Sequence, residues 1–155
     1  HGIIISPIHP VSQRVDFGTC GTGVNHPAYQ LNIMSFDSTK THVRLMSGVH
    51  NQNLINSTCS NTSSVPYFVE NWTYNGFSDW VLPSLDDLYA IKSNQTIINA
   101  SLATAHKLKT GGYNYWSSTT FSSLGIFQVS FGSNYTGNTY NSQGSNSYFV
   151  PVRYF

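Results

Sequence analysis

The segment Pro83-Ser84-Leu85-Asp86-Asp87-Leu88-Tyr89 opens residues 84–109, the part of the chain with a convincing helical pattern. The proline prevents the chain before it from being helical, and Ser84 with the acid three residues later has the pattern of a capping box. The leucines and the tyrosine follow a three-to-four spacing, which is typical of a helix with one apolar face. We therefore expect a first helix that starts at Ser84 and ends near Asn94.

A second helix is predicted from Thr96 to Lys107, and the glycine pair at 111–112 then breaks the chain. Before the helices, residues 50–66 are rich in Asn, Ser and Thr and are predicted to form a polar loop. Short runs with the character of strands precede this loop: Ile3–Ile5, Tyr29–Phe36 and Thr41–Met46.

After the helices, the alternation over Gly125–Phe131 predicts a strand whose buried face carries Phe127, Val129 and Phe131. The chain closes with another run of strand character, interrupted by Pro151. Strands toward both ends and two helices between them predict an α+β fold, with the helices packed on a twisted antiparallel sheet with long loops. The opposite face of the 125–131 strand is predicted to point outward: Ile126, Gln128 and Ser130.

The chain has 155 residues, of which 8% are charged, and a formal net charge of +1. This length fits a single domain over residues 1–155. A nearly neutral protein lacks the clustered Lys and Arg that nucleic acids and anionic bilayers require, and no apolar run reaches the length of a membrane span. Aromatic residues make up 14%, and Ser, Thr and Asn replace the missing charges. This favours a recognition surface, with an ordinary extracellular β-rich protein as the alternative.

The two cysteines, Cys20 and Cys59, are separated by 39 positions and have loop-like surroundings. Two cysteines alone cannot complete a four-ligand structural zinc site. Their separation suits a loop-closing disulfide, worth roughly 3–4 kcal/mol in the chain-entropy treatment. We therefore predict a disulfide and an oxidising compartment, with two unrelated free thiols as the alternative.

Three motifs follow one another in the second half of the chain. Asp79–Leu88 resembles the start of a helix with the pattern W-R-L-P-T…E-L, Tyr115–Thr119 resembles Y-W-S-S-T, and Tyr148–Arg153 resembles a terminal Y-V-R-(C/P)-V-R. In order and spacing they are similar to the Lcl C-terminal-domain family, named after the C-terminal domain of a bacterial collagen-like adhesin. The resemblance covers about residues 77–155.

This resemblance implies a C-type-lectin-like fold and a module that binds ligands rather than transforming them. It also implies an extracellular location or display on a cell or virion surface. Relatives with an R-P-V-R ending include the variable proteins of diversity-generating retroelements, which place hypervariable residues on the lectin-fold surface, here about residues 113–155. We therefore expect a recognition module for a protein or glycan receptor, as a monomer or trimer. The alternative is an adhesin with a fixed site for sulfated glycosaminoglycans, with which the collagen-like adhesin is associated.

The stretch Phe121–Ser147 fits a diversified surface, because mutagenesis directed at adenines turns Asn codons into codons for Tyr, Ser, Thr, Gly, Ile and Phe. An ordinary polar loop of a lectin domain is the alternative. Ligand binding is predicted for Phe121, Ser122, Ser123, Leu124, Ile126, Gln128, Ser130, Ser133, Asn134, Tyr135, Thr136, Asn138, Tyr140, Asn141 and Ser142.

Other chemistry has weak support in the sequence. The Glu-Pro-Asn, Gln-Pro-Asp and Trp-Asn-Asp tripeptides of calcium-dependent lectins do not occur, and the six histidines lack metal-site spacing. No G-x-S-x-G motif occurs either. We therefore expect no metal, no cofactor and no catalytic residue. His42 and His50 are predicted at surface or turn positions, and Trp80 and Trp116 in the core.

A sulfated glycan would require cations. Val81 and Val150 stand where the family commonly has Arg, which weakens the inference of an anionic-ligand site from the resemblance. Solvated surface lysines are the simpler interpretation of the cations that remain. Those cations are Lys40, Arg44, Lys92, His106, Lys107, Lys109 and Arg153.

Overall fold

A computed structural model describes residues 2–8, 15–18, 29–30, 38, 40–59, 61–120, 125–131, 138–142 and 146–155. Within these residues the fold is α+β, as predicted, although it has more helices than the two expected. The helices are α1 (Gly48–Thr58), α2 (Val65–Glu70), α3 (Leu85–Ser93), α4 (Gln95–Ser101) and the short 3-10 helix η1 (Thr104–His106). The strands are β1 (Ile3–Ile5), β2 (Val15–Asp16), β3 (Tyr29–Gln30), β4 (Thr41–His42), β5 (Tyr113–Thr120), β6 (Gly125–Phe131), β7 (Asn138–Ser142), β8 (Asn146–Ser147) and β9 (Val152–Tyr154).

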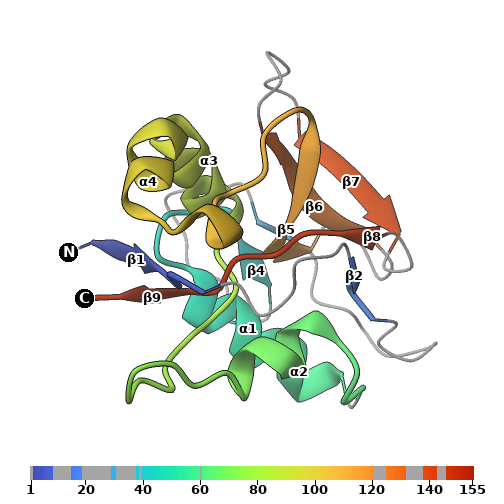
Figure 1. The fold of residues 1–155 in the computed structure, drawn as a ribbon. Helices are drawn as coiled ribbons and strands as arrows, with labels where there is room; N and C mark the ends of the chain where they lie inside the picture. Colours follow the sequence, from blue (N-terminus) through green and yellow to red (C-terminus); the bar gives the residue numbers. More distant parts are fainter. Residues whose placement is uncertain are drawn as a thin grey trace.

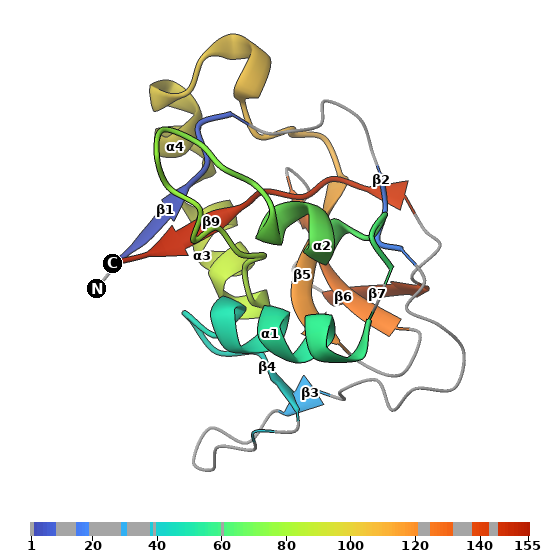
Figure 2. The same cartoon turned by 90° about the horizontal axis from the view of Figure 1, so that it is seen from below.

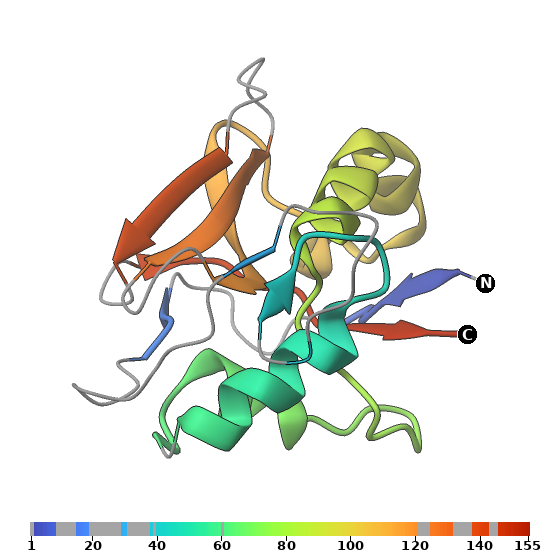
Figure 3. The ribbon, with the colours of Figure 1, turned by 180° about the vertical axis from the view of Figure 1, so that it is seen from behind.

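The strands form several small sheets. The largest has the order β5-β6-β7 and is antiparallel, while β1 pairs with β9, β2 with β8 and β3 with β4. Figure 1 shows the three-stranded sheet on one side, α3 and α4 beside it, and α1 and α2 below. Because β1 pairs antiparallel with β9, the two ends of the chain lie side by side (Figure 3). None of the helices in the described part of the chain is long and apolar enough to cross a membrane.

Two apolar clusters form the core. The first lies between α3, the β5–β6 hairpin and β9, and includes Leu88, Val129 and Phe131. The second includes Ile55 of α1 and Trp116 of β5. Figure 2 shows α1 and α2 together on the side that faces the viewer, with β5 and β6 behind them. Burying an aliphatic or aromatic side chain contributes about 1.5–3 kcal/mol, so these clusters are the main source of stability.

The start of α3 confirms the predicted capping box. Ser84 Oγ accepts the backbone N–H of Asp87 at 3.3 Å, and Asp87 Oδ2 accepts that of Ser84 at 2.9 Å. The helix ends at Ser93 with Asn94 as its C-cap, as predicted.

The second predicted helix is shorter than expected. α4 ends at Ser101, and η1 follows after a break with extended backbone at Leu102. The Asn99 side chain donates to the carbonyl of Leu108 at 3.0 Å and accepts its N–H at 2.7 Å. These two bonds hold the following chain back against α4, so a continuous helix to Lys107 does not form.

The prediction of a polar loop over residues 50–66 is wrong, because α1 and α2 occupy most of this segment. α1 turns two amides inward, since Asn51 and Gln52 are buried together with Ile55. Gln52 Oε1 accepts the backbone N–H of Leu82 at 2.8 Å. A buried helix face that is partly made of amides has a weak apolar periodicity, which is why the sequence suggests a loop.

The strand predicted over Thr41–Met46 is shorter in the structure, where β4 covers Thr41–His42. The chain turns directly afterwards, and Met46 has a left-handed φ of 64°. Of the strand predicted over Tyr29–Phe36, Tyr29–Gln30 forms β3 and the remainder lies outside the described residues.

His42, predicted at a surface or turn position, is buried instead. Its backbone N–H and carbonyl each bond the side chain of Asn51 at 2.7 Å. Its ring packs edge-to-face against the ring of His50, with 4.9 Å between the centroids. The prediction fails because β4 lies between α1 and β5, where its backbone is used to join the two.

Candidate functional site

The β5–β6–β7 sheet carries seven of the fifteen residues predicted to bind a ligand. β5 and β6 pair with Tyr115 opposite Val129, and the register shifts between Trp116 and Thr120. On its other edge β6 pairs with β7, from Gly125 opposite Ser142 to Val129 opposite Asn138. β6 is therefore the central strand of this sheet and β7 lies at its edge.

β6 is buried along its whole length. Phe127, Val129 and Phe131 belong to the first core cluster, as predicted. The rings of Phe131 and Tyr115 lie 4.4 Å apart, centroid to centroid, so the hairpin is packed tightly at this end.

The prediction that Ile126, Gln128 and Ser130 face a ligand is wrong, because all three are buried. Ile126 lies in the second core cluster together with Phe17. Gln128 Nε2 donates to Ser147 Oγ at 2.8 Å. The second face of β6 is thus covered by the chain that follows β2 and by β8, whereas the alternation rule assumed solvent on that side.

The other predicted binding residues fall into two groups. One group lies on β7, and the other lies, by chain order, between β5 and β6 or between β6 and β7. On β7 the structure describes the backbone alone of Asn138, Tyr140, Asn141 and Ser142. Outside the described residues lie Phe121, Ser122, Ser123, Leu124, Ser133, Asn134, Tyr135 and Thr136.

Hydroxyl side chains of β5 anchor this sheet to the rest of the molecule. The four consecutive residues Ser117–Thr120 are all buried. Ser118 Oγ donates to the carbonyl of Pro83 at 3.1 Å. Thr119 Oγ1 donates to the carbonyl of His42 at 2.9 Å. The hydroxyls of the Trp-Ser-Ser-Thr stretch therefore fix β5 against β4 and against the start of α3.

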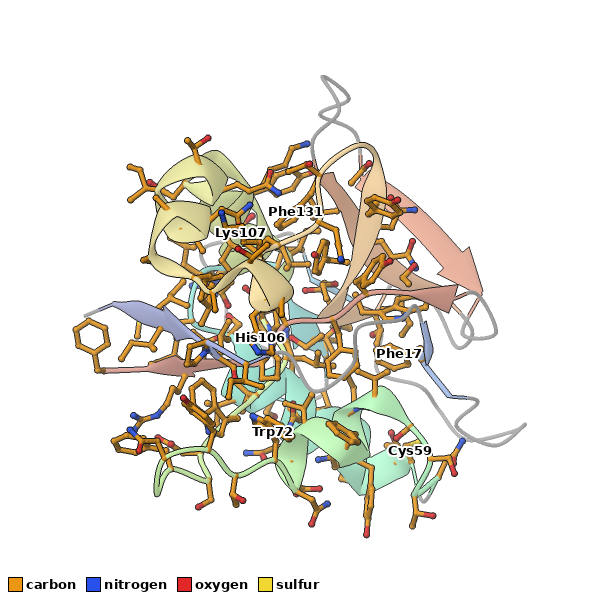
Figure 4. All side chains as sticks on the ribbon, in the orientation of Figure 1. Phe17, Cys59, Trp72, His106, Lys107 and Phe131 are labelled. Carbon is orange, nitrogen blue, oxygen red and sulfur yellow. The ribbon has the colours of Figure 1, made fainter. Side chains whose placement is uncertain are left out.

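The prediction that Trp80 and Trp116 lie in the core is confirmed. Trp116 is fully buried and meets Phe17 edge-to-face, with ring centroids 5.2 Å apart. Trp80 is buried, and its Nε1 donates to the carbonyl of Phe77 at 3.1 Å. Trp72, partly buried, packs against the second core cluster (Figure 4).

The C-terminal segment runs along the other edge of β5. The backbone N–H of Trp116 donates to the carbonyl of Tyr148 at 2.8 Å. Burial raises the pKa of Tyr115 to about 12, and its hydroxyl accepts the N–H of Lys109 at 2.8 Å. β5 thus pairs with β6 on one edge and with the segment at Tyr148 on the other.

Arg153 of the terminal motif is paired. Its Nε and Nη2 donate to the two carboxylate oxygens of Asp79 at 2.7 and 2.9 Å, and its guanidinium lies 3.7 Å from the ring centroid of Phe77. This hydrogen bonding to Arg153 lowers the pKa of Asp79 below its ordinary value. Val81 and Val150, which stand where the resembling family commonly has Arg, are both buried in the first core cluster.

The remaining cations are spread over several elements. Lys107 and Lys109 are exposed on the segment between η1 and β5, and Lys92 lies partly buried on α3. His106 ends η1 (Figure 4), and Lys40 and Arg44 flank β4. Asp87 is the last acid in the sequence, so residues 88–155 contain cations without any acid.

Cys59 directly follows α1 and is disulfide-bonded. Cys20, the chain's other cysteine, lies outside the described residues. Figure 4 shows Cys59 beside α2. Across the described part of the chain, no three His, Cys, Asp or Glu side chains gather as a metal site.

The sequence did not reveal a buried hub at Asp87. Besides capping α3, its Oδ1 accepts the N–H of Met46 at 2.8 Å and its Oδ2 accepts the hydroxyl of Tyr154 at 2.5 Å. The Tyr154 hydroxyl accepts the N–H of Gly48 at 3.1 Å, and burial raises the pKa of this phenol. Only the capping pattern could have drawn attention to Asp87, because the other partners are distant in sequence.

No family model, no curated protein and no solved structure matches this chain.

Proposed function

We propose that this chain is a surface-displayed or secreted recognition module with a C-type-lectin-like framework, whose C-terminal sheet presents a diversified surface to a protein or cell-surface receptor. The observation that carries the proposal is a contrast within that sheet. β6 is buried over its whole length, whereas the tract 132–145 that follows it consists of Gly, Ser, Asn, Thr, Tyr and Gln. In this arrangement the buried strand would supply stability, and the neighbouring tract of Tyr, Ser and Asn would be free to bind.

The path of the chain supports a lectin-like framework. The first and last strands pair with each other, with Ile3 opposite Tyr154. Between them, α1 and α3 both contact β5 of the three-stranded sheet. The buried hydroxyls of Ser117–Thr120 give the motif that resembles the Lcl family a physical role, because they lock the sheet to β4 and α3.

The binding surface that we propose is smaller than the one predicted from the sequence. The three buried β6 residues are removed from it. Tyrosines supply contact area at low entropy cost, while Ser, Thr and Asn supply adaptable hydrogen bonds, so the surface requires no metal. Its members are Phe121, Ser122, Ser123, Leu124, Ser133, Asn134, Tyr135, Thr136, Asn138, Tyr140, Asn141 and Ser142.

The proposal is tested by asking whether this surface accepts new binding specificities. A displayed library randomised at Ser122, Ser123 and Ser133–Thr136 is selected against hen lysozyme as a model partner. We expect binders with micromolar or tighter affinity, and unfolding midpoints within a few degrees of the parent. The control library randomises six exposed helix positions: Asn53, Tyr67, Phe68, Thr96, Ile97 and Ala100.

The control library should yield far fewer binders than the first. Equal yields from the two libraries would contradict a dedicated recognition surface. Loss of folding in most members of the first library would also contradict the proposal, because it would assign these residues to the core.

A fixed site for a sulfated glycan is the second candidate, favoured by the absence of acids after Asp87 and by the exposure of Lys107 and Lys109. It predicts retention on immobilised heparin that falls steeply with salt. The double variant Lys107→Gln with Lys109→Gln should then elute much earlier, and Lys40→Gln should not. A recognition surface of Tyr, Ser and Asn predicts weak retention and little dependence on these lysines.

A further inference from the structure

An apolar hollow of about 450 Å³ lies between β1, α3, α4 and the turn before α1. It is separate from the β5–β6–β7 surface, and Figure 1 shows β1 passing below α3 and α4. None of the described residues that line it has a charged side chain. The lining consists of Gly2, Ile3, Ile5, Leu45, Met46, Ala90, Ile91, Asn94 and Ile98.

The floor of the hollow belongs to the core. Ile91 is a buried member of the first core cluster, and Ile3, Ile5 and Ile98 pack against that cluster. Asn94, the polar side chain among the described lining residues, donates its amide to the carbonyl of Ala90 at 2.9 Å. The floor is therefore formed by packing that exists without any ligand.

The rim consists of two apolar side chains on a tight turn, with Leu45 56% and Met46 37% exposed. Turn positions of this kind usually carry Gly, Asn or Asp, because a left-handed φ is unfavourable for other residues. Met46 nevertheless has a φ of 64°. An exposed apolar residue in an unfavourable backbone conformation, at the edge of an apolar hollow, points to a role in binding.

The first turn of α3 imposes this conformation. Asp87 Oδ1 accepts the N–H of Met46 at 2.8 Å, and Ser84 Oγ donates to the carbonyl of Arg44 at 2.6 Å. The N–H of Asp86 donates to the carbonyl of Val43 at 2.8 Å. Three bonds to one helix end hold the backbone of this turn in place before a ligand arrives.

The size and charge of the hollow define its occupant. Ligand pockets are typically about 300–1,000 Å³, whereas a stable protein interface requires about 800 Å² from each partner. Of the large apolar side chains that are exposed in the described part of the chain, Leu45 and Met46 alone line the hollow. The exposed apolar area at the hollow is therefore too small for a stable dimer interface. The described lining residues carry no charge that would compensate the desolvation of an ion. We propose that this hollow binds a small, uncharged aliphatic molecule, independently of the recognition surface.

The probe is 1-octanol, titrated into protein with ¹³C-labelled Ile, Leu and Met methyl groups and followed by NMR. We expect saturable shifts at Ile91, Ile98 and Met46, and affinity about tenfold or more above that for octanoate or octylammonium. Ala90→Leu should fill the hollow and weaken octanol binding at least about tenfold, since Ala90 lines it and leucine suits a helix.

Ala100→Leu, on exposed α4 surface outside the hollow, is the matched control and should leave octanol binding unchanged. Met46→Gly relieves the left-handed backbone and removes a rim side chain, so it should weaken binding without lowering the unfolding midpoint.

Absence of saturable octanol binding would overturn the proposal, as would shifts confined to methyl groups outside the hollow. Equal effects of Ala90→Leu and Ala100→Leu would also overturn it. Sedimentation that reveals a dimer abolished by Ala90→Leu would assign the hollow to a second copy of the chain instead.

Discussion

Asp87 is fully buried, and three donors converge on its carboxylate: the N–H groups of Ser84 and Met46 and the hydroxyl of Tyr154. Asp87→Asn keeps the shape but replaces one acceptor oxygen by an N–H₂ group, which then faces a donor. A buried hydrogen bond to a charged group contributes about 1.5–3 kcal/mol. We expect a loss of about 2–3 kcal/mol in the free energy of unfolding, measured by urea denaturation.

The neighbouring acid is the matched control for this substitution. Asp86 is only partly buried and does not belong to the hub. Asp86→Asn should not lower the free energy of unfolding at neutral pH, because the ionised Asp86 carboxylate disfavours the folded state. Similar losses for the two variants would show that the hub does not concentrate stability at Asp87.

Asp79 and Asp86 should affect the pH dependence of stability in opposite directions. Hydrogen bonding to Arg153 lowers the pKa of Asp79, so its contribution to stability is present above the ordinary pKa of 3.8 and is lost as pH falls through the folded pKa. Burial, followed by the Asp87 charge, raises the pKa of Asp86, so ionisation of Asp86 disfavours the folded state as pH rises through 3.8 and above.

Urea denaturation from about pH 3 to pH 6 measures this difference. Relative to the parent, Asp79→Asn should lose stability as pH rises and Asp86→Asn should gain it. The Asp79 effect should shrink in high salt, because that carboxylate is exposed and screened. Parallel pH profiles for the two variants would contradict these pKa assignments.

At the level of elements, α1 is joined to the sheets by amides. Asn51 bonds the N–H and carbonyl of His42 at 2.7 Å each and donates to Ser118 Oγ at 3.2 Å. Asn51→Leu leaves these buried groups without that partner, at about 1–3 kcal/mol for each. Urea unfolding should show a loss of at least about 3 kcal/mol. Asn53→Leu, two residues further along α1 and exposed, should stay within about 0.5 kcal/mol of the parent.

The sequence predicts an element where its capping residues and apolar pattern are local, and it misses an element whose buried face carries amides. α3 was predicted to within a residue because Ser84 and Asp87 give a local capping signal and its leucines give a clear period. β1 follows from a short apolar run, and β6 follows from the alternation over Gly125–Phe131. α1 was missed because Asn51 and Gln52 stand where apolar residues are expected.

The predicted site shows a different limit of sequence reasoning. Alternation identified the strand at β6 and its Phe127 face, but it cannot tell whether the second face meets solvent or more protein. Ile126 and Gln128 are covered by Phe17 and Ser147, which are distant in sequence. The Asp87 hub likewise depends on contacts that no local pattern encodes.

At the scale of the whole molecule, the disulfide at Cys59 constrains the unfolded chain. If its partner is Cys20, reduction should lower the free energy of unfolding by roughly 3–4 kcal/mol. Unfolded protein without reductant should contain no titratable thiol, and Cys59→Ser should reproduce the effect of reductant. Two reactive thiols in that titration would contradict a disulfide.

Stability and recognition should reside in different parts of the molecule. The proposed function places the tyrosines of the 132–145 tract on the binding surface, so they should contribute little to folding. Tyr135→Ala and Tyr140→Ala should each change the free energy of unfolding by less than about 0.5 kcal/mol, while Phe131→Ala should cost about 3–5 kcal/mol. If either tyrosine anchors a partner, its truncation should weaken binding by about 1–2 kcal/mol. Losses of stability comparable to that of Phe131→Ala would place these tyrosines in the core and remove the surface on which recognition depends.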